Sequence, residues 1–531
     1  MNIFRRCYAA VQRVDVPAAV RRLRARLPSR GAVLASIGVV LLSLFVGMVV
    51  ALGVPQVTLV LVGVIVLVPF VIFVGTRELL PLMFIYVFLV QGAANSFAHF
   101  HAAIWLGSGF AFLFLCRTAL ELVDLRAMRA LAAHVPRFGS RSVIWCAVLF
   151  LVCFSFSLSL GHASMIQIIS AVRFALPMFG VLFALYFIEF SERRIALLWN
   201  LLLLIVVLQI PLVIYQHFFS MTIDGWDSVV GSFGYGMSPV LVLFSIAGIS
   251  YALARWMRGL MSTPVLVLII LAGCANMLLG EVKAVLFWMP MAIVLILRKR
   301  ILRNVFAFAG YGLLIAGLLV GTALAYKAMY WGEKGTGGGS LEDKIARRGG
   351  YFFNPYEINQ KTGEVSRIAS LYIWYRDPIP TVRERLIGYG PGASAAAEGT
   401  GYGVVAKRFR PLRVNSTALS ALLWDVGILG TLVFIAIPVA GIATALRFVR
   451  RAQAPPSQLA IVDTSLTILC LLLTTMIYNR NLVDETTVQL LAYFCLGNIV
   501  QFCRYHRHAG AEVATAQPQP ARAPTALAMR A

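Results

Sequence analysis

The sequence predicts an all-α polytopic membrane protein with about 14 transmembrane helices and one large loop before the last three spans. Three observations predict this fold class: the apolar composition, the regular apolar runs and the uneven placement of Lys and Arg. Of the 531 residues, 60% are hydrophobic and 13% are charged, with a mean hydropathy of +0.84. A soluble domain is about a quarter charged. Because so apolar a chain would aggregate in water, it indicates an integral membrane protein.

The first element is a basic N-terminal arm. Residues 1–30 hold eight Arg and one Asp, and no small-residue cleavage site follows a short apolar region. The segment therefore predicts a cytoplasmic arm and not a cleaved signal peptide. Such an arm can lie on anionic lipid or remain in solvent, and the sequence leaves both open.

Fourteen apolar runs follow, of which the third is short and the twelfth is long. We interpret the twelfth as one span or as a partly embedded segment at 416–427 followed by a full span, since a helical span needs about 20 residues. The first eleven spans fall within 31–326 and the last three within 416–505. The runs lie at 33–53, 56–75, 79–92, 102–122, 143–160, 167–189, 195–216, 236–256, 263–279, 283–298, 304–326, 418–447, 461–478 and 485–503.

Lys and Arg are concentrated in the short loops that would lie on one side of the membrane. The opposite short loops hold Arg480 as their one cation, apart from Lys283 at the edge of a span. Since cytoplasmic loops carry the excess of positive charge, we predict that both termini are cytoplasmic. Residues 327–415 would then lie on the other side, and residues 506–531 predict a disordered cytoplasmic tail.

The large loop at 327–415 combines a glycine run, many Lys and Arg, fewer acids and interleaved aromatic residues. It can be a solvated basic loop attracted to lipid headgroups. It can also bind an anionic, lipid-linked substrate, because Arg matches phosphate oxygens bidentately. Nucleic acid is a poor ligand for this loop, since the loop faces away from the cytoplasm.

Other ionisable residues are predicted at the same face of the membrane. Arg173 lies in the sixth span, where a cation costs about 3 kcal/mol to bury and so needs a partner or a ligand. Glu281 and Lys283 share a tight turn and can pair with each other, and Arg480 lies between two Asn. Arg173 can form a structural ion pair or extend to the outer headgroups, so these residues can be unrelated, whereas a shared anion site explains them together.

Several chemistries have no motif in this sequence. It contains no Walker A loop, dinucleotide-binding fingerprint, H-E-x-x-H or EF-hand motif. None of the eight Cys has a C-x-x-C spacing, so we predict neither a metal site nor a cofactor. The paired interrupted helices that mark many transporters are also not visible.

Two stretches in and after the loop resemble the O-antigen ligase and O-antigen polymerase superfamily of bacterial polysaccharide enzymes. In the first, Ser366-Arg367-Ile368-Ala369 leads through Trp374 to Ile387-Gly388-Tyr389-Gly390-Pro391-Gly392. In the second, Asn415-Ser416 leads to Trp424-Asp425-Val426-Gly427-Ile428-Leu429-Gly430. Members share an Arg and a Trp before a glycine turn, and an Asn-Ser/Thr stretch before an acid-x-Gly helix end. The match covers about 65 residues.

The resemblance implies glycosyl transfer from an undecaprenyl-diphosphate-linked sugar to a sugar hydroxyl at the periplasmic face of the inner membrane, without nucleotide or metal. It also implies a flippase and a chain-length regulator of the same pathway as possible partners, besides membrane lipid. In the ligases a His precedes the Asn of the second motif, but here Val414 precedes Asn415. That difference favours a polymerase that joins repeat units.

The resemblance and the charges together give a set of expected site residues. Arg173, Lys283 and Arg367 are expected on the diphosphate, with Arg376 and Arg480 as weaker candidates. Asp425 or Glu281 can act as acid or base, although each can equally be structural. Further expected contributions come from Asn415 as an orienting amide, Trp374 and Tyr372 as sugar platforms, and Gly388, Gly390 and Gly392 as a turn that shapes the backbone.

Two alternatives remain open. A ligase that moves glycan onto lipid A core or onto protein would use the same chemistry. A lipid-linked oligosaccharide flippase would also suit fourteen spans and a cationic interior, but the charges gather at one face and the large loop is unusual for a rocking transporter.

Overall fold

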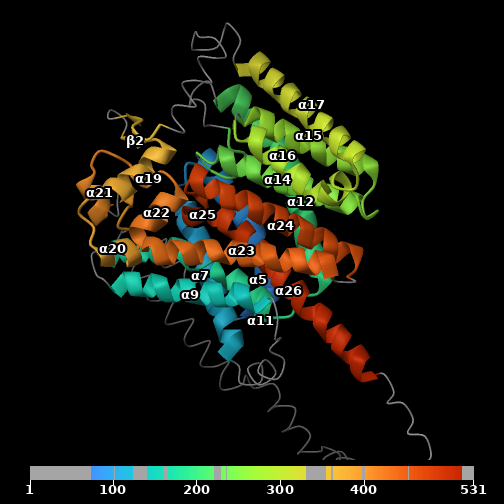
Figure 1. The fold of residues 1–531 in the computed structure, drawn as a ribbon, viewed down its shortest axis with the longest axis horizontal. Helices are drawn as coiled ribbons and strands as arrows, with labels where there is room; N and C mark the ends of the chain where they lie inside the picture. Colours follow the sequence, from blue (N-terminus) through green and yellow to red (C-terminus); the bar gives the residue numbers. More distant parts are fainter. Residues whose placement is uncertain are drawn as a thin grey trace, which may run out of the picture. The chain divides into compact units, whose positions relative to one another are not determined.

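A computed structural model of the chain shows a bundle of long helices with small elements at one end (Figure 1). The predicted arm at 1–30 and the first predicted span lie outside the described residues, and the second lies almost wholly outside them. The structure describes residues 73–100, 102–123, 140–159, 165–220, 229–234, 236–280, 282–330, 354–359, 363–397, 401–451 and 454–516.

Within these residues, nine helices are long enough and apolar enough to cross a membrane. The protein is therefore a polytopic, all-helical membrane protein, as predicted. One of the nine crosses as α5 (Thr76–Ile85), the π-helical turn η1 (Tyr86–Val90) and α6 (Gln91–Phe97) in succession. The others are α7 (Ala102–Val123), α9 (Ser140–Ser159), α12 (Glu192–Tyr215) with η2 (Gln216–Ser220), α14 (Ser238–Trp256), α17 (Val305–Tyr330), α23 (Gly427–Arg451), α24 (Pro456–Tyr478) and α26 (Thr486–Ala516).

Two further predicted spans are shorter helices of 17 residues each, α15 (Thr263–Leu279) and α16 (Val285–Ile301). At the C-terminus, α26 continues as helix to Ala516. The disordered tail predicted from residue 506 is therefore wrong for 506–516, where Ala and other good helix formers extend the helix. Residues 517–531 lie outside the described part.

Two predicted spans are interrupted. The sixth divides into α10 (Met165–Ala175) and α11 (Phe179–Phe187), because Pro177 lacks the amide hydrogen that would continue the helix. The twelfth divides into α22 (Ala418–Asp425) and α23, with Gly427 at the corner in the left-handed region at φ +68°. The chain therefore forms two helices here and not the single helix over 418–447, while the embedding of the first segment in the membrane stays a prediction.

The core of the bundle is formed by α14, α24 and α26, which the other helices surround (Figure 1). In the apolar window of α26, 94% of the residues are buried, whereas in that of α17 none is. Trp199 stacks on Tyr251 at 4.8 Å and contacts Phe494 at 5.5 Å between ring centroids, which joins α12, α14 and α26. Buried aromatic pairs of this kind add to the packing of the helices.

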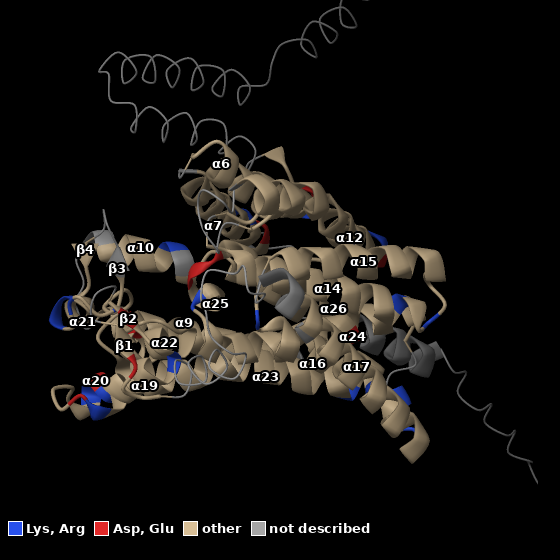
Figure 2. Ribbon diagram, turned by 90° about the horizontal axis from the view of Figure 1, so that it is seen from above, with Lys and Arg blue, Asp and Glu red and all other residues tan. Residues whose placement is uncertain are grey.

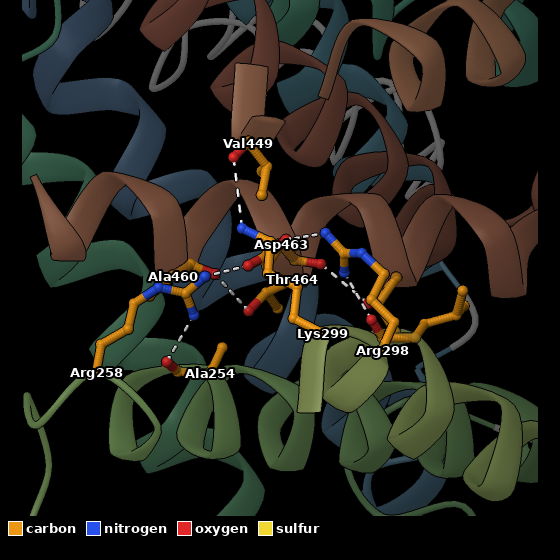
Figure 3. A network of polar contacts seen from close by, with 10 residues as sticks. Ala254, Arg258, Arg298, Lys299, Val449, Ala460, Asp463 and Thr464 are labelled. Carbon is orange, nitrogen blue, oxygen red and sulfur yellow. Dashed lines mark hydrogen bonds and ion pairs between the residues drawn. The ribbon is translucent and has the colours of Figure 1, made fainter. Parts of the chain in front are cut away.

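At one end of the bundle, a buried carboxylate holds the helix ends together (Figure 3). Asp463 of α24 forms ion pairs with Arg258, which follows α14, and with Arg298 near the end of α16. Lys299 donates to the carbonyl oxygen of Val449 at 3.5 Å, which adds α23 to the cluster. These are helix ends that the charge pattern predicts on one side of the membrane.

At the other end, the described part of the predicted loop folds into a small cap. It contains two short hairpins and three short helices, and Figures 1 and 2 show these elements together at that end. Tyr389, Val405, Val414 and Trp424 form its apolar core. The elements are β1 (Ile358–Asn359), β2 (Glu364–Val365), α19 (Arg367–Arg376), α20 (Val382–Ile387), β3 (Ala396–Ala397), β4 (Gly401–Tyr402) and α21 (Val404–Arg408).

Candidate functional site

A cavity of about 320 Å³ lies where the cap meets the helix ends. It is bounded by α9, α10, the glycine turn of the cap, the α22–α23 corner, the short helix α25 (Asn481–Asp484) and the start of α26. One part of the wall is aromatic, with Phe150, Phe154 and Tyr493. The polar part of the wall is formed by Gln167, Ser170, Asp425, Arg480, Asp484, Glu485 and Gln489.

Asp425 fixes the glycine turn to the corner between α22 and α23. Its two carboxylate oxygens accept hydrogen bonds from the amides of Gly392 at 3.0 Å and Ser394 at 2.8 Å. Its backbone carbonyl accepts from the Ser157 hydroxyl at 2.6 Å and the Gly390 amide at 3.1 Å. Burial raises the pKa of Asp425 to about 6, although these donors and the charge of Arg480 oppose the rise. The carboxylate thus acts as a structural anchor for the turn.

The turn needs glycine because it passes very close to that corner. A Cβ atom on Gly388, at φ +87°, would lie 2.4 Å from the carbonyl oxygen of Asp425. One on Gly427 would lie 2.5 Å from the amide nitrogen of Gly388. Gly390 and Gly392 also have positive φ. The two stretches that carry the family resemblance are therefore packed against each other, and the glycines shape the backbone at the cavity wall.

The segment before α26 supplies most of the charge in the cavity. Arg480 forms an ion pair with Asp484 one turn later. Glu485, the next residue, lines the cavity, and no described residue donates a hydrogen bond to its carboxyl group. Burial first, and then the neighbouring Asp484, raise the pKa of Glu485 to about 8, while Arg480 and Arg173 lower it.

Arg173 lies on α10 between Ala171 and Ala175, which both line the cavity. Its guanidinium group stacks on the ring of Trp105 at 3.4 Å from the centroid, a cation–π contact with α7. Its charge is close enough to lower the pKa of Glu485. Arg173 itself is not among the residues that line the cavity.

Arg367 begins α19 and points toward the same segment from the cap. Its guanidinium group donates to the carbonyl oxygen of Ser416 at 3.4 Å and lies 5.9 Å from the ring centroid of Tyr478. Tyr478 ends α24, two residues before Arg480. The adjacent Asn415 is 3% exposed, and its side-chain amide nitrogen has no hydrogen-bond acceptor among the described residues.

The aromatic and cationic residues predicted on α19 form the outer side of the cap. Tyr372 accepts from Arg376 at 3.0 Å and pairs with the hydroxyl of Tyr356 at 3.2 Å. The ring of Trp374 is covered by Arg385, whose guanidinium carbon lies 4.6 Å from its centroid. None of these side chains lines the cavity, so they lie apart from Asp425 and Arg480.

Lys283 lies in the turn before α16 and is half-buried, and no described contact joins its side chain to the cavity. Glu281 lies outside the described residues. Of the expected set, the cavity itself therefore brings together Gly392, Asp425 and Arg480. Arg173 and Arg367 lie beside it, around the segment 478–485.

Sequence reasoning missed Glu485, Asp484, Gln167 and Gln489. The sequence did contain a signal for the two acids. They lie four and five residues after Arg480, at the edge of an apolar span, where charged residues are rare. Gln167 had no such signal, since only the fold brings α10 against the cap; its amide nitrogen donates to the carbonyl oxygen of Tyr402 at 2.7 Å.

The fold and the cavity define a polytopic membrane protein with a polar site at one end of its helices. Within the described residues, no group of three or more His, Cys, Asp and Glu side chains could hold a metal ion. No known protein family and no curated protein sequence matches this chain.

Proposed function

We propose that this protein is a glycosyltransferase that joins undecaprenyl-diphosphate-linked repeat units at the periplasmic face of the bacterial inner membrane. One observation supports this most directly. The glycine turn and the acid-x-Gly helix end, which carry the resemblance to polysaccharide polymerases, are hydrogen-bonded to each other through Asp425 at the wall of a cavity that also holds Arg480 and Glu485.

The positions of the cations support a lipid-diphosphate donor. Arg173 and Arg367 come from two separate parts of the chain and flank the segment 478–485, which itself carries Arg480. Guanidinium groups can neutralise the negative charge that develops on a departing diphosphate without a metal ion. Because this cluster lies where the helices end, a donor whose lipid chain remains in the membrane can reach it.

The cavity favours a polymerase over a ligase. The ligase motif places a His before Asn415, whereas this chain has Val414 there, and no His is among the described residues that line the cavity. Repeat-unit polymerisation is therefore our conclusion, and transfer of a finished glycan to lipid A core or protein is the alternative that the experiment separates.

The test compares the surface glycan of a strain that lacks the protein with strains that carry Arg367→Ala or Arg383→Ala at equal protein level. Arg383 is an exposed Arg in the same cap and serves as the matched control. We expect single repeat units in the deletion strain, about 10²-fold less polymer with Arg367→Ala, and normal polymer with Arg383→Ala. Accumulated lipid-linked polymer would indicate a ligase, and donor held at the cytoplasmic face would indicate a flippase; either result contradicts the proposal.

A further inference from the structure

The charge inside the cavity does not suit a diphosphate. Among the described residues, its wall carries three carboxyl groups, from Asp425, Asp484 and Glu485, against one guanidinium group, from Arg480. Even with Glu485 protonated, Asp425 and Asp484 outnumber Arg480 on the described wall, so a phosphate group placed there would be repelled. The cations that suit the donor, Arg173 and Arg367, lie beside the cavity and not on its wall.

The same wall suits a saccharide. It offers carboxyl and amide groups on one part and the rings of Phe150, Phe154 and Tyr493 on another. A sugar ring presents hydroxyl groups at its edge and C–H groups on its faces, so it can satisfy both parts at once. The volume of about 320 Å³ falls at the small end of the range for ligand sites, which is about 300–1,000 Å³.

Most polar groups of the wall are already engaged. Both oxygens of Asp425 accept from backbone amides, and Asp484 is paired with Arg480. Apart from the hydroxyl groups of Ser170 and Tyr493, two acceptors remain among the described residues of the wall. The carboxyl group of Glu485 receives no hydrogen bond from a described residue, and the buried side-chain oxygen of Gln489, a residue 3% exposed, has no donor among them.

Glu485 lies directly before α26 and has extended backbone, and its carbonyl oxygen accepts from the amide of Gln489 in the first turn at 3.0 Å. Both acceptors therefore belong to the N-terminal end of this helix. The amide nitrogen of Gln489 donates to the carbonyl oxygen of Val483 at 2.5 Å, which fixes the side chain and leaves its oxygen for a ligand. An unpaired buried acceptor costs about 1–3 kcal/mol. A ligand that donates hydrogen bonds here would recover that cost.

We propose that this cavity binds the acceptor saccharide and that Glu485 is the catalytic base that takes the proton from its attacking hydroxyl. This inference rests on the proposed function, because it assigns the second substrate and the proton of the same reaction. The acceptor oxygen forms a bond to the anomeric carbon of the donor, and the bond from that carbon to the diphosphate oxygen breaks. The diphosphate leaves with the bonding electron pair, the hydroxyl proton passes to the Glu485 carboxylate, and water later removes it.

The surroundings of Glu485 set the pH at which it can act. With its pKa raised to about 8, the carboxyl group is mostly protonated at neutral pH and becomes a stronger base once it ionises. The rate should therefore rise with pH and level off above about pH 8. Several charged or titratable groups face Glu485. They are Asp484 at the end of α25, Arg480 directly before α25, Asp425 of α22, Arg173 of α10 and Tyr493 of α26.

The experiment measures polymer growth in detergent-permeabilised membranes of the native strain, which supply their own lipid-linked donor and acceptor, from about pH 6 to about pH 9. Glu485→Gln should slow growth by about 10²-fold or more and remove the dependence on pH. Asp484→Asn should move the rising part of the pH profile to lower pH, because it removes a negative charge that raises the pKa of Glu485. Glu357→Gln changes an exposed carboxyl group of the cap in the same way and should keep both rate and profile.

A second measurement separates loss of the base from loss of the donor site or of the fold. Undecaprenyl diphosphate should raise the unfolding temperature of the purified wild-type protein and of Glu485→Gln equally, since Gln resembles the protonated acid in shape and charge. Growth at the wild-type rate in Glu485→Gln, or an unchanged pH profile, would overturn this inference alone. Normal polymer in a strain without the protein would overturn the proposed function and this inference together.

Discussion

Replacing Asp463 should destabilise the bundle far more than removing an exposed acid. Its side chain is 5% exposed and is paired with Arg258 and Arg298, whose side chains are each 18% exposed. Asp463→Ala leaves both guanidinium groups largely buried without a counter-charge. Breaking a buried pair by removing one partner costs about 3–5 kcal/mol. Because both Arg also donate to backbone carbonyl oxygens, at 2.9 Å and 2.6 Å, we expect the lower end of that range.

Unfolding in detergent micelles, followed by tryptophan fluorescence, measures this loss. The matched control is Glu78→Ala, which breaks the exposed pair between Glu78 and Arg194, whose side chains are 53% and 46% exposed. Exposed pairs contribute about 0–1 kcal/mol, so the control should remain close to the wild type. If both variants lose the same free energy of unfolding, the cluster at Asp463 does not hold the helix ends together.

A triple variant tests the electrostatic reasoning directly. Replacing Arg258 and Arg298 by Met and Asp463 by Leu removes all three charges and keeps apolar side chains of similar size. Buried ion clusters replaced in this way are often neutral or stabilising. The triple variant should therefore be more stable than Asp463→Ala alone, and a further loss of stability would refute an uncompensated charge as the cause.

Three further outcomes follow from the site. Gly388→Ala should reduce polymer length and the free energy of unfolding, because its Cβ would lie 2.4 Å from the carbonyl oxygen of Asp425. The control is Gly236→Ala, which has positive φ but no neighbour within 4 Å of its Cβ. It should lose only about 1–2 kcal/mol to backbone strain in the same unfolding assay. Asp425→Asn should loosen the glycine turn, since an amide cannot accept from both backbone donors; faster proteolysis of the cap would show it. The pKa of Glu485 is about 8 in the folded protein and about 4.3 for a Glu in an unfolded chain, so folding favours the protonated carboxyl group. The stability that this protonation contributes is complete below about pH 4 and is lost as the pH rises to about 8. The unfolding temperature of Glu485→Gln should not show that component of the fall.

Composition and charge placement predicted the class of fold because both are properties of whole helices and not of single residues. Apolar runs must be buried in lipid or protein, so nine long helices appear in the described part of the chain where runs were predicted. Interruptions depend on single residues and are harder to predict. Pro177 divides α10 from α11, although Pro211 and Pro438 lie inside continuous helices. Whether a Pro ends a helix depends on its neighbours, which a sequence does not reveal.

The site was harder to predict, because its chemistry depends on contacts between distant segments. The motifs around Gly388 and Asp425 lie about 35 residues apart, and their order indicated that they could meet. Counting cations at one predicted face drew attention to Lys283 and Arg376, which lie away from the cavity. Glu485 was overlooked because an acid beside an apolar run resembles an ordinary helix start.

Asp425 and Glu485, two partly buried acids of the cavity, differ in a way that suggests separate roles. Asp425 accepts two backbone hydrogen bonds, which keep its pKa near 6, while Glu485 accepts none from described residues and lies beside Asp484, which raises its pKa to about 8. When two carboxyl groups in one site differ in this way, the environments assign the chemistry. Asp425 stays ionised over a wider pH range and holds the turn in place, whereas Glu485 can gain and lose a proton near neutral pH. An acceptor hydroxyl bound between Glu485 and Gln489 would meet the group whose protonation can change during the reaction, while the donor's charge is held by the cations outside the cavity wall.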